Sequence, residues 1–424
     1  MLPRIGFAGM THLGLVSAVA ASEKGFGVVC FDPEAGHVRL LTEGRWPIAE
    51  AQLDELAVKN RGRLRFSADP VALRACDIVY VAPDVPTDDA GGSDLGAISA
   101  LLDQVSSAVS DETVVVILSQ VPPGFTREKQ RRIRNLYYQV ETLIFGRAVE
   151  RALRPERYVV GCADPAQPLP ARLAAFLAVD GCPILPMRYE SAELAKIAIN
   201  MCLVASVSTA NTLAELCERI GAEWSEIVPA LKLDRRIGEH AYLAPGLGIA
   251  GGNLERDLAT VCTLADRYGT DADVVRAWVA NSRHRRDWAL TTLWKHVLTG
   301  TQDPVIAVLG LTYKENTHSV KNSPALALLD NLQSFATRVY DPVVSSPPGT
   351  RPRCHRAASA LEACEGADAL AVMTPWPEFR RLDPAEIASR MRGGIVLDPY
   401  AVFSAVACRS AGMRYLTLGS PPKD

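Results

Sequence analysis

The chain has 424 residues, of which 48% are hydrophobic and 22% are charged, and this composition indicates an ordinary globular protein with two or three domains. Its formal net charge of −3 gives no reason to expect binding to nucleic acid or to an anionic membrane. The ten cysteines lack CxxC and Cys/His spacing, so we expect reduced thiols in a cytoplasmic protein, with no disulfides and no metal site. We also expect neither a signal peptide nor an apolar run long enough to span a bilayer.

The first thirty residues predict the opening of a dinucleotide-binding domain. Residues 4–8 and 27–31 predict buried strands, residues 15–23 predict a helix, and the turn before that helix reads Gly9-Met-Thr11-His12-Leu13-Gly14. Asp32 follows the second strand, where an acid accepts hydrogen bonds from a ribose diol.

The two glycines and the residues between them have distinct roles in such a turn. Gly9 permits the tight turn and Gly14 lets the helix approach the strand, so that the helix N-terminus faces the cofactor phosphates, and Thr11, His12 and Leu13 of the turn are expected to contact the cofactor. Thr11 stands where the middle glycine of the motif is expected. Its side chain must therefore point away from the phosphates or push the cofactor outward.

Residues 188–221 predict one unusually long helix, because they are rich in Ala, Leu, Ile and Glu and have neither Gly nor Pro before Gly221. Ser191 is expected to cap its start. Lys196 and Asn200 lie four positions apart and therefore share one face of this helix. That face is either solvated or turned toward a cleft between two α/β halves.

A second strand–glycine–helix start follows at residues 305–310, with a buried strand expected over 305–313. The predicted fold class is therefore α/β, with two Rossmann-like, doubly wound domains joined by a long central helix. We expect domains at 1–187, 188–300 and 301–424.

The order of residues resembles the UDP-glucose/GDP-mannose dehydrogenase family along most of the chain. It begins with Gly9–Val16, Asp32, Val38, Leu41, Gly44 and Pro47. Members of this family oxidise the C6 alcohol of a nucleotide sugar to a carboxylate with two NAD⁺. The resemblance implies NAD as the cofactor, bound by the 1–187 domain, a nucleotide sugar bound by the 301–424 domain, and a homodimer formed through the long helix.

Several side chains match the family's catalytic motifs. Lys196 and Asn200 in SAELAKIAIN match the pair that grips the oxygen destined to become an oxyanion. Glu141 matches the first glutamate of P-E-F-L-R-E-G, and Asp257 matches an aspartate that orders water near the oxidised carbon. Either acid is a candidate for the base, acting through water.

Other matches imply contacts with the substrate. Lys314 matches a lysine that binds the nucleotide-sugar diphosphate, and Arg236 in LDRRIG matches an arginine that reaches the sugar site of the neighbouring subunit. Leu143, in the segment of Glu141, and Gly251, in a glycine-rich stretch at 246–252, are also expected to contact the substrate.

Four further positions depart from the family pattern. Gln120 replaces a threonine that helps to hold a water, and Phe145 replaces a second glutamate. Lys321 replaces an arginine that reaches cofactor phosphate, which keeps the charge but loses the bidentate fork. Tyr400 stands in the segment where the family has an arginine that contacts the nucleotide sugar.

The most informative departure is Asn253, which falls on the family's nucleophilic cysteine. That cysteine adds to the intermediate aldehyde before the second oxidation, whereas an amide nitrogen is almost non-nucleophilic. Cys262 is expected to pack in the core, and Cys202 is expected to point away from Asn200, so neither is a good substitute.

Retention of Lys196 and Asn200 without the nucleophile favours an NAD-dependent oxidation that stops at the carbonyl. One alternative is a redox-neutral, epimerase-like reaction in which the carbonyl is reduced again. Another is a non-catalytic homologue that only binds nucleotide sugar or pairs with an active relative, because Thr11 and Tyr400 both depart from binding motifs.

Overall fold

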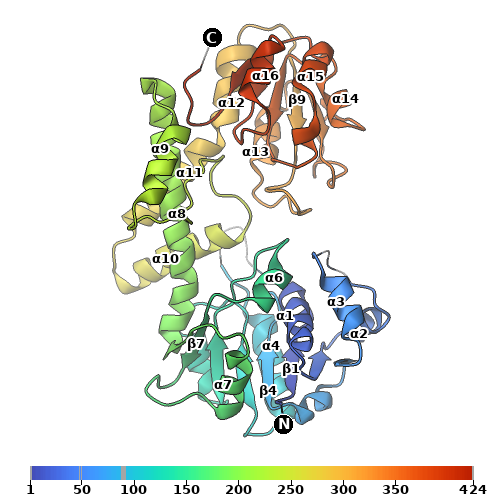
Figure 1. Ribbon diagram of the computed structural model, residues 1–424, viewed down its shortest axis with the longest axis vertical. Coiled ribbons are helices and arrows are strands. Elements are labelled where there is room, and N and C mark those ends of the chain that lie inside the picture. Colours follow the sequence, from blue (N-terminus) through green and yellow to red (C-terminus); the bar gives the residue numbers. More distant parts are fainter. Residues whose placement is uncertain (1, 47, 49, 87–91, 423–424) are drawn as a thin grey trace. The chain divides into compact units, whose positions relative to one another are not determined.

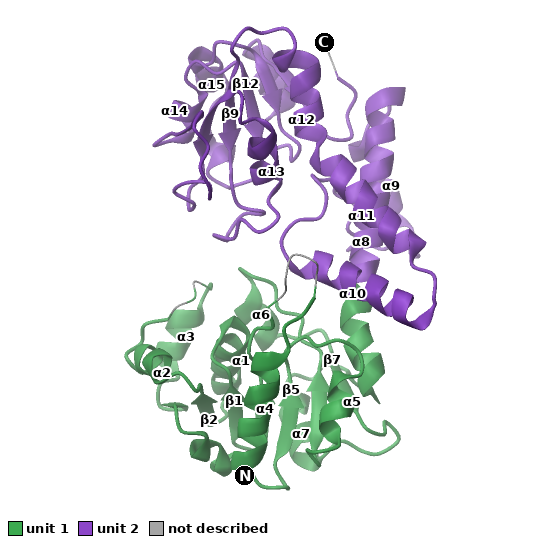
Figure 2. Ribbon diagram, turned by 180° about the vertical axis from the view of Figure 1, so that it is seen from behind, with its two compact units in different colours: residues 1–199 green, residues 200–424 purple. Residues whose placement is uncertain are grey.

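The computed structural model describes residues 2–46, 48, 50–86 and 92–422, so Pro47, one of the positions that carry the resemblance, lies outside the described residues. The chain folds into two compact units, residues 1–199 and residues 200–424 (Figure 2). The finer division at 187 and 300 stays a prediction.

An eight-stranded sheet forms the centre of the N-terminal unit. Its strands, in sheet order, are β3 (Leu64–Ser67), β2 (Val28–Phe31), β1 (Ile5–Ala8), β4 (Ile78–Val81), β5 (Val114–Ile117), β6 (Leu136–Gln139), β7 (Tyr158–Cys162) and β8 (Ile184–Arg188). All neighbours pair in parallel except β6 and β7. The first six strands follow the order of a dinucleotide-binding Rossmann domain, which confirms the predicted fold class for this unit.

Helices cover both faces of this sheet (Figure 1). They are α1 (His12–Glu23), α2 (Ala35–Thr42), α3 (Leu53–Lys59), the 3₁₀ turn η1 (Pro70–Ala75), α4 (Gly96–Ala108), α5 (Phe125–Gln130), α6 (Ala148–Leu153) and α7 (Ala171–Ala178). Val79 of β4 packs in an apolar cluster with α4, whereas the next residue, Tyr80, packs in a cluster with α1 and α7. Because successive strand residues point to opposite faces, the sheet is buried on both sides, as parallel sheets are.

Helix α8 extends from Tyr189 to Ile220, close to the predicted range. Ser191 lies inside the helix, so the predicted cap at Ser191 is wrong. The buried carboxylate of Glu193 instead accepts hydrogen bonds from the backbone N–H groups of Gly124 and Thr126, at 2.6 and 2.8 Å, which joins the first turns of α8 to the start of α5.

The expectation that no apolar segment is long enough to span a bilayer needs correction. Among the described residues, α8 meets that requirement by length and composition, and 33% of its most apolar window is buried. A long core helix of a globular protein meets the same requirement, so this single helix is weak evidence for a membrane span.

The C-terminal unit begins with the remainder of α8 and a group of helices, α9 (Trp224–Leu233), α10 (Asn253–Tyr268), α11 (Asp273–Arg286), α12 (Trp288–Leu293) and the π-helical turn η2 (Trp294–Leu298). Small side chains let α8 pack closely here, because Ala210 and Ala214 are fully buried against Trp224 and Leu243. Val204 of α8 packs in a separate apolar cluster, with Leu258 of α10.

A second, entirely parallel sheet follows, with the order β11 (Cys354–Arg356), β10 (Ala336–Tyr340), β9 (Val305–Leu309), β12 (Ala369–Val372), β13 (Ile395–Leu397) and β14 (Arg414–Leu416). Its helices are α13 (Pro324–Asn331), α14 (Ala360–Cys364), η3 (Phe379–Arg381), α15 (Pro384–Arg390) and α16 (Ala405–Ser410). Numbered from β9, this order repeats that of the first Rossmann sheet, so the predicted pair of Rossmann-like folds is confirmed. The strand expected over 305–313 ends earlier, because Gly310 turns the chain with a φ of +91°.

Candidate functional site

The turn after β1 has the shape that a dinucleotide phosphate requires. Gly9 has a φ of +90°, and a Cβ there would lie 2.8 Å from the backbone nitrogen of Pro83. A Cβ on Gly14 would lie 1.9 Å from the carbonyl oxygen of Gly9. Both glycines are therefore required by space, and α1 begins directly after the turn, so its free N–H groups face outward from it.

Thr11 resolves the question raised by its position in the motif. Its hydroxyl lies 3.2 Å from the carbonyl oxygen of Ala82 and also within hydrogen-bonding reach of the Asp84 carboxylate, so both possible acceptors of its single proton belong to the protein. The side chain is therefore turned toward the protein, which leaves the backbone of residues 11–13 as the surface that meets phosphate. Leu13 is partly buried and packs against the apolar cluster of α1.

Asp32 lies directly after β2, as predicted, and is largely buried. Its carboxylate accepts hydrogen bonds from the backbone N–H groups of Met10 at 2.8 Å and Glu34 at 3.0 Å, and Nδ1 of His37 lies 3.5 Å away. Each carboxylate oxygen keeps a second lone pair. Asp32 can therefore hold the glycine turn and still accept a hydrogen bond from a ribose hydroxyl.

Glu50 is a buried acid beside this turn that the sequence analysis did not identify. One of its oxygens lies 3.0 Å from Nε2 of His12, and the carboxylate accepts hydrogen bonds from the N–H groups of Gly146 and Ala148 at 3.1 and 3.0 Å. The His12 ring also stacks on Phe145 with centroids 4.2 Å apart. His12 and Phe145 thus join the cofactor turn to the segment that carries Glu141.

Glu141 and Lys196 interact within the N-terminal unit. Burial raises the pKa of the Glu141 carboxyl above its ordinary value, while the charge of Lys196 and the hydrogen bond from the Leu143 N–H act in the opposite direction. A carboxylate with a raised pKa is a better proton acceptor near neutral pH. The half-buried side chain of Leu143 packs inward against an apolar cluster of α1, α3 and α6, and Gln120 lies half-buried after β5.

Asn200 and Asp257 come together in the C-terminal unit. The Asn200 amide donates a hydrogen bond of 2.5 Å to Oδ2 of Asp257, which is fully buried at the start of α10. Nε of Arg256 lies 3.2 Å from the other carboxylate oxygen. The carboxylate is thus held on both sides, while the amide of Asn200 keeps its oxygen and a second N–H for a ligand.

Asn253 is the first residue of α10, and its side chain is exposed. The glycines before it bring another loop close. Gly251 has a φ of +85°, its N–H donates to the carbonyl oxygen of Lys321 at 3.2 Å, and its own carbonyl accepts from the Asn322 side chain at 2.9 Å. The Lys321 side chain lies close to Gly252, since a Cβ on Gly252 would be 3.3 to 3.5 Å from its Cδ, Cε and Nζ atoms. A cation therefore lies beside the N-terminus of α10.

The two cysteines that were not expected to replace the nucleophile lie where the sequence predicted. Cys262 is partly buried and packs in an apolar cluster with Val204 and Leu258. Cys202 is exposed on α8. The ten cysteines are all free, and six of them are buried: Cys30, Cys76, Cys162, Cys217, Cys364 and Cys408.

The second sheet carries a turn that resembles the first. Its acid, Asp341, accepts hydrogen bonds from five donors: the backbone N–H groups of Leu311, Thr312, Val343 and Val344 and the indole of Trp376. The buried hydroxyl of Thr312 has no partner among the described residues. Nζ of Lys314 lies 5.8 Å above the Tyr313 ring, at the end of the same turn. A donor without a partner and a lysine at this edge suit a phosphate.

The predicted substrate contact Arg236 and the departing position Tyr400 both interact with the protein's own groups. The Arg236 guanidinium forms two hydrogen bonds to Asp234, of 3.0 and 2.6 Å, and 89% of its side-chain surface is exposed. Tyr400 lies partly buried at the end of β13 and packs among the apolar side chains of the second sheet. Contact of Arg236 with a substrate stays a prediction.

Comparison with known proteins places this geometry in context. The chain matches the NAD binding domain of the UDP-glucose/GDP-mannose dehydrogenase family over residues 3–175, its central domain over 190–283 and its UDP binding domain over 307–405. It is 31% identical to a UDP-glucose 6-dehydrogenase of Rhizobium meliloti (strain 1021), an alignment that covers 99% of this chain and 100% of that protein.

The chain belongs to the UDP-glucose/GDP-mannose dehydrogenase family. It is also 29% identical to UDP-glucose 6-dehydrogenase TuaD of Bacillus subtilis (strain 168), over 99% of this chain and 94% of that one. Among solved structures, a UDP-glucose dehydrogenase from Pyrobaculum islandicum has a TM-score of 0.84 at 26% identity and covers 98% of this chain and 97% of its own. The chain is therefore an oxidoreductase of an NAD-dependent nucleotide-sugar dehydrogenase family, and NAD is its cofactor.

The residues of the N-terminal unit fit that cofactor. A Cβ at Gly9 or Gly14 would fill the cradle, Thr11 is turned away from it, and Asp32 can accept a hydrogen bond from the ribose. The predicted NAD turn of this family member thus has the required shape despite the missing middle glycine.

Glu50, Asn322 and Glu255 are contributors that the sequence did not reveal. Glu255 contacts the Asn322 side chain, and its pKa is raised by burial, with Lys321 acting in the opposite direction. These residues contact partners that are distant in the sequence. Glu50 is 96 and 98 residues from the backbone N–H groups that it binds, and Glu255 is 67 residues from Asn322. Local sequence patterns carry no signal for such contacts.

Proposed function

We propose that this family member oxidises an alcohol of a nucleotide sugar to a carbonyl in a single two-electron step. The observation that carries the proposal is Asn253, an exposed carboxamide at the first position of α10, where the family's nucleophilic cysteine is expected. The substrate class rests on the family's UDP binding domain and on the Lys314 turn.

The roles of the residues follow from their chemistry. Lys196 supplies a positive charge and Asn200 an amide N–H to the alkoxide that forms as the alcohol loses its proton. When bound, NAD⁺ would supply the acceptor for the hydride of the carbinol carbon. Asn253 has no electron pair basic enough to add to the resulting carbonyl, so no covalent intermediate forms and the carbonyl is released.

Glu141 is the better of the two candidate bases. Both oxygens of Asp257 are held, one by Asn200 and the other by Arg256, and its side chain is fully buried. Burial keeps the pKa of Glu141 raised, although the charges of Lys196, His12 and Arg151 and the hydrogen bond from the Leu143 N–H act in the opposite direction. We assign the proton acceptor to Glu141, through a water held by Gln120, and a water-ordering role to Asp257.

The orientation of Thr11 weakens the alternative of a non-catalytic homologue, since its side chain leaves the phosphate cradle open. The redox-neutral alternative keeps the same residues and differs only in the fate of the carbonyl. We further propose a cytoplasmic homodimer formed through α8, since Leu213, Leu216 and Ile220 expose 40%, 50% and 64% of their surface on that helix.

Counting NADH per sugar consumed tests the proposal. We expect one NADH per sugar, together with a carbonyl product that a hydrazine reagent traps. The variant Asn253→Cys is expected to raise the ratio above one, because a thiolate can add to the carbonyl.

Two NADH per sugar with a carboxylate product from the unaltered chain would show that the one-step proposal is wrong. No net NADH with a stereochemically changed sugar would instead support the redox-neutral alternative. Failure to bind NAD⁺ in a calorimetric titration would support the non-catalytic one.

Replacing Glu141 by glutamine separates function from stability. Protonation of Glu141 removes the base, so kcat/KM should fall at low pH, and because the pKa of Glu141 is raised this fall should lie above the ordinary range of a glutamate. The variant Glu141→Gln should lose this pH dependence and about 10²- to 10⁴-fold of the rate. Because the pKa of Glu141 is higher in the folded chain than in the unfolded chain, the unfolded carboxyl loses its proton at lower pH. The free energy of unfolding therefore falls as pH rises toward neutral. Glu141→Gln should therefore be at least as stable as the unaltered chain in urea.

The matched control is Glu150→Gln on the neighbouring helix α6. Glu150 is exposed and its pKa is lowered by a hydrogen bond from Arg147, so this variant should keep both rate and pH profile. A Glu141→Gln variant with a normal rate would assign the base elsewhere.

A further inference from the structure

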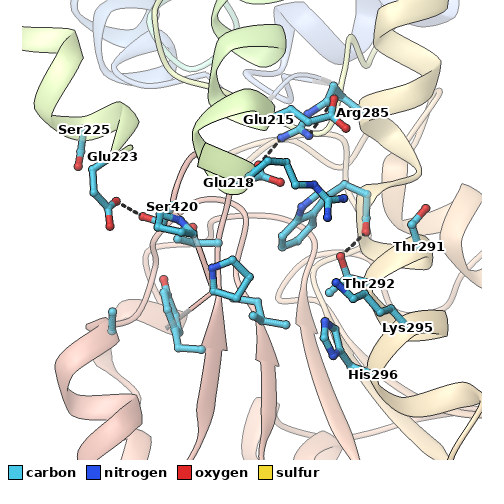
Figure 3. Close-up of a pocket in the computed structure, with 18 of the residues that line it drawn as sticks. Glu215, Glu218, Glu223, Ser225, Arg285, Thr291, Thr292, Lys295, His296 and Ser420 are labelled. Carbon is cyan, nitrogen blue, oxygen red and sulfur yellow. Dashed lines mark hydrogen bonds and ion pairs between the residues drawn. The ribbon is translucent and has the colours of Figure 1, made fainter. Parts of the chain in front are cut away.

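A small cavity of about 80 Å³ lies in the N-terminal unit, beside the proposed base. It lies between the sheet and helices α1, α6 and α7, and Glu141, two residues after β6, is part of its lining. A larger cavity of about 400 Å³, at the C-terminal end of α8, is lined by other residues, and its Glu218 carboxylate already binds Arg285 (Figure 3). The smaller cavity is therefore the one that can serve the reaction.

The alternation of side chains along β6 turns Glu141 toward this cavity. Tyr138 and Val140 pack in the apolar cluster on the α4 face of the sheet, whereas Gln139 lines the cavity on the opposite face. The pairing continues past the strand, because the Val140 N–H donates to the carbonyl oxygen of Val159 at 3.0 Å. Successive side chains of an extended segment point to opposite faces, so Glu141 lies on the same side as Gln139.

The polar groups of the lining have hydrogen-bonding capacity that suits water. The Tyr80 hydroxyl donates to Oε1 of Gln139 at 3.0 Å. Among the described residues, the amide N–H groups of Gln139 and the hydroxyl of Ser17 have no partner. A buried water needs about 15 Å³ of such space and two to four polar partners. The cavity therefore has both the room and the partners for a short chain of water molecules.

The far end of the cavity reaches the surface at Arg157, just before β7, whose side chain is 36% exposed. The three cations of the lining lie 2.7 to 3.3 Å from carboxylates: Lys24 from Asp180, and Arg151 and Arg157 from Glu156. Together with the carboxylate of Glu141, the charges of the two signs balance. The cavity therefore does not repel a proton that crosses it.

We propose that this cavity holds the water chain through which Glu141 returns its proton to solvent. The proposal deepens the proposed function and rests on it, because it takes Glu141 as the base. In each turnover the alcohol proton reaches the Glu141 carboxylate by way of the water at Gln120. The O–H bond of the carboxyl then breaks as one forms to a cavity water, and one proton leaves at the Arg157 end, so Glu141 is ionised again before the next turnover.

Filling the cavity tests the proposal on the whole chain, with UDP-glucose and NAD⁺ as the substrates. Ser17 shares the cavity face of α1 with Ala20 and Ala21, so Ser17→Leu places an apolar side chain in the path of the water. We expect Ser17→Leu to lower kcat by about 5- to 50-fold, less than the 10²- to 10⁴-fold expected for loss of the base. Ser17→Ala should lower kcat by no more than about twofold, because water can still fill the space.

Stopped-flow measurement separates the release of the proton from the oxidation. The absorbance of NADH and that of a pH indicator in weak buffer are followed after the same mixing. In the unaltered chain and in Ser17→Ala the proton should appear together with NADH. In Ser17→Leu it should appear after NADH, because the carboxyl of Glu141 keeps it.

The matched control is Ser107→Leu, the same substitution at an exposed serine of α4 outside the cavity, which should change neither kcat nor the time of proton release. Urea titration and calorimetric binding of NAD⁺ check that the fold and the NAD turn are kept. If Ser17→Leu does not fold, Gln139→Leu takes its place, since it removes the polar lining at a half-buried position and should cause the same delay.

Two results would overturn the proposal while leaving the proposed function intact. One is a folded Ser17→Leu or Gln139→Leu chain that releases its proton together with NADH at an unchanged kcat. The other is a further loss of kcat when Ser17→Leu is added to Glu141→Gln, because a chain without the base has no proton to return. A Glu141→Gln variant with a normal rate would instead show that the assignment of the base is wrong, and the proton route with it.

Discussion

The variant Lys196→Met is expected to lower kcat by about 10²- to 10³-fold while changing KM little, because a donor that meets charge only as it develops stabilises the transition state and not the bound substrate. Lys196 lies on α8 within reach of the charge of Glu141. Methionine keeps the length and the apolar stem of the side chain and removes only the ammonium group. Steady-state kinetics with saturating NAD⁺ measures the effect.

A second readout distinguishes this catalytic role from a structural one. Without the ammonium group the pKa of Glu141 should rise further, because the charge of Lys196 now lowers it, so the acid limb of the pH profile should move to higher pH. Lys232→Met, at an exposed lysine of α9, is the matched control and should change neither kcat nor the limb. A Lys196→Met variant that keeps most of its kcat would remove Lys196 from the reaction.

The variant Gly14→Ala is expected to destabilise the N-terminal unit and to abolish NAD⁺ binding. Two effects oppose each other: alanine in a helix gains about 1 kcal/mol over glycine, whereas the new Cβ would lie 1.9 Å from the carbonyl oxygen of Gly9. That distance is far inside van der Waals contact with backbone, so the turn must open, at a cost of about 3 kcal/mol or more. The clash therefore decides the sign.

Urea denaturation and calorimetric titration with NAD⁺ measure both consequences. The control is Gly62→Ala, since a Cβ there meets nothing within 4 Å and the backbone does not have a positive φ. We expect Gly62→Ala to change stability by less than about 0.5 kcal/mol and to leave NAD⁺ affinity intact. A Gly14→Ala variant that is as stable as the control and still binds NAD⁺ would contradict the geometry of the turn.

Much of the fold could be predicted because its signals are local. The alternation of short Val- and Ile-rich runs with helices, the glycines at 9 and 14 and the acid at 32 specify a Rossmann opening within thirty residues. Element ends were less accurate. Helix α1 begins at His12 and not at Leu15, because the helix N-terminus forms part of the turn itself.

The site was less predictable, because the sequence names residues but not their partners. It singled out Asn200 and Asp257, yet gave no indication that the amide of one holds the carboxylate of the other, 57 positions away. It could not show which way the hydroxyl of Thr11 turns, since that depends on the carbonyl of Ala82 in a neighbouring strand region.

The five donors around Asp341 have a consequence for nucleotide selectivity. In the first sheet, Asp32 keeps lone pairs that a sugar diol can use, whereas the corresponding acid of the second sheet spends both oxygens on its own scaffold. The second turn is therefore stiff but cannot use this carboxylate to distinguish a ribonucleotide from its 2′-deoxy counterpart. Discrimination between nucleotides at this turn has to come from groups other than the Asp341 carboxylate.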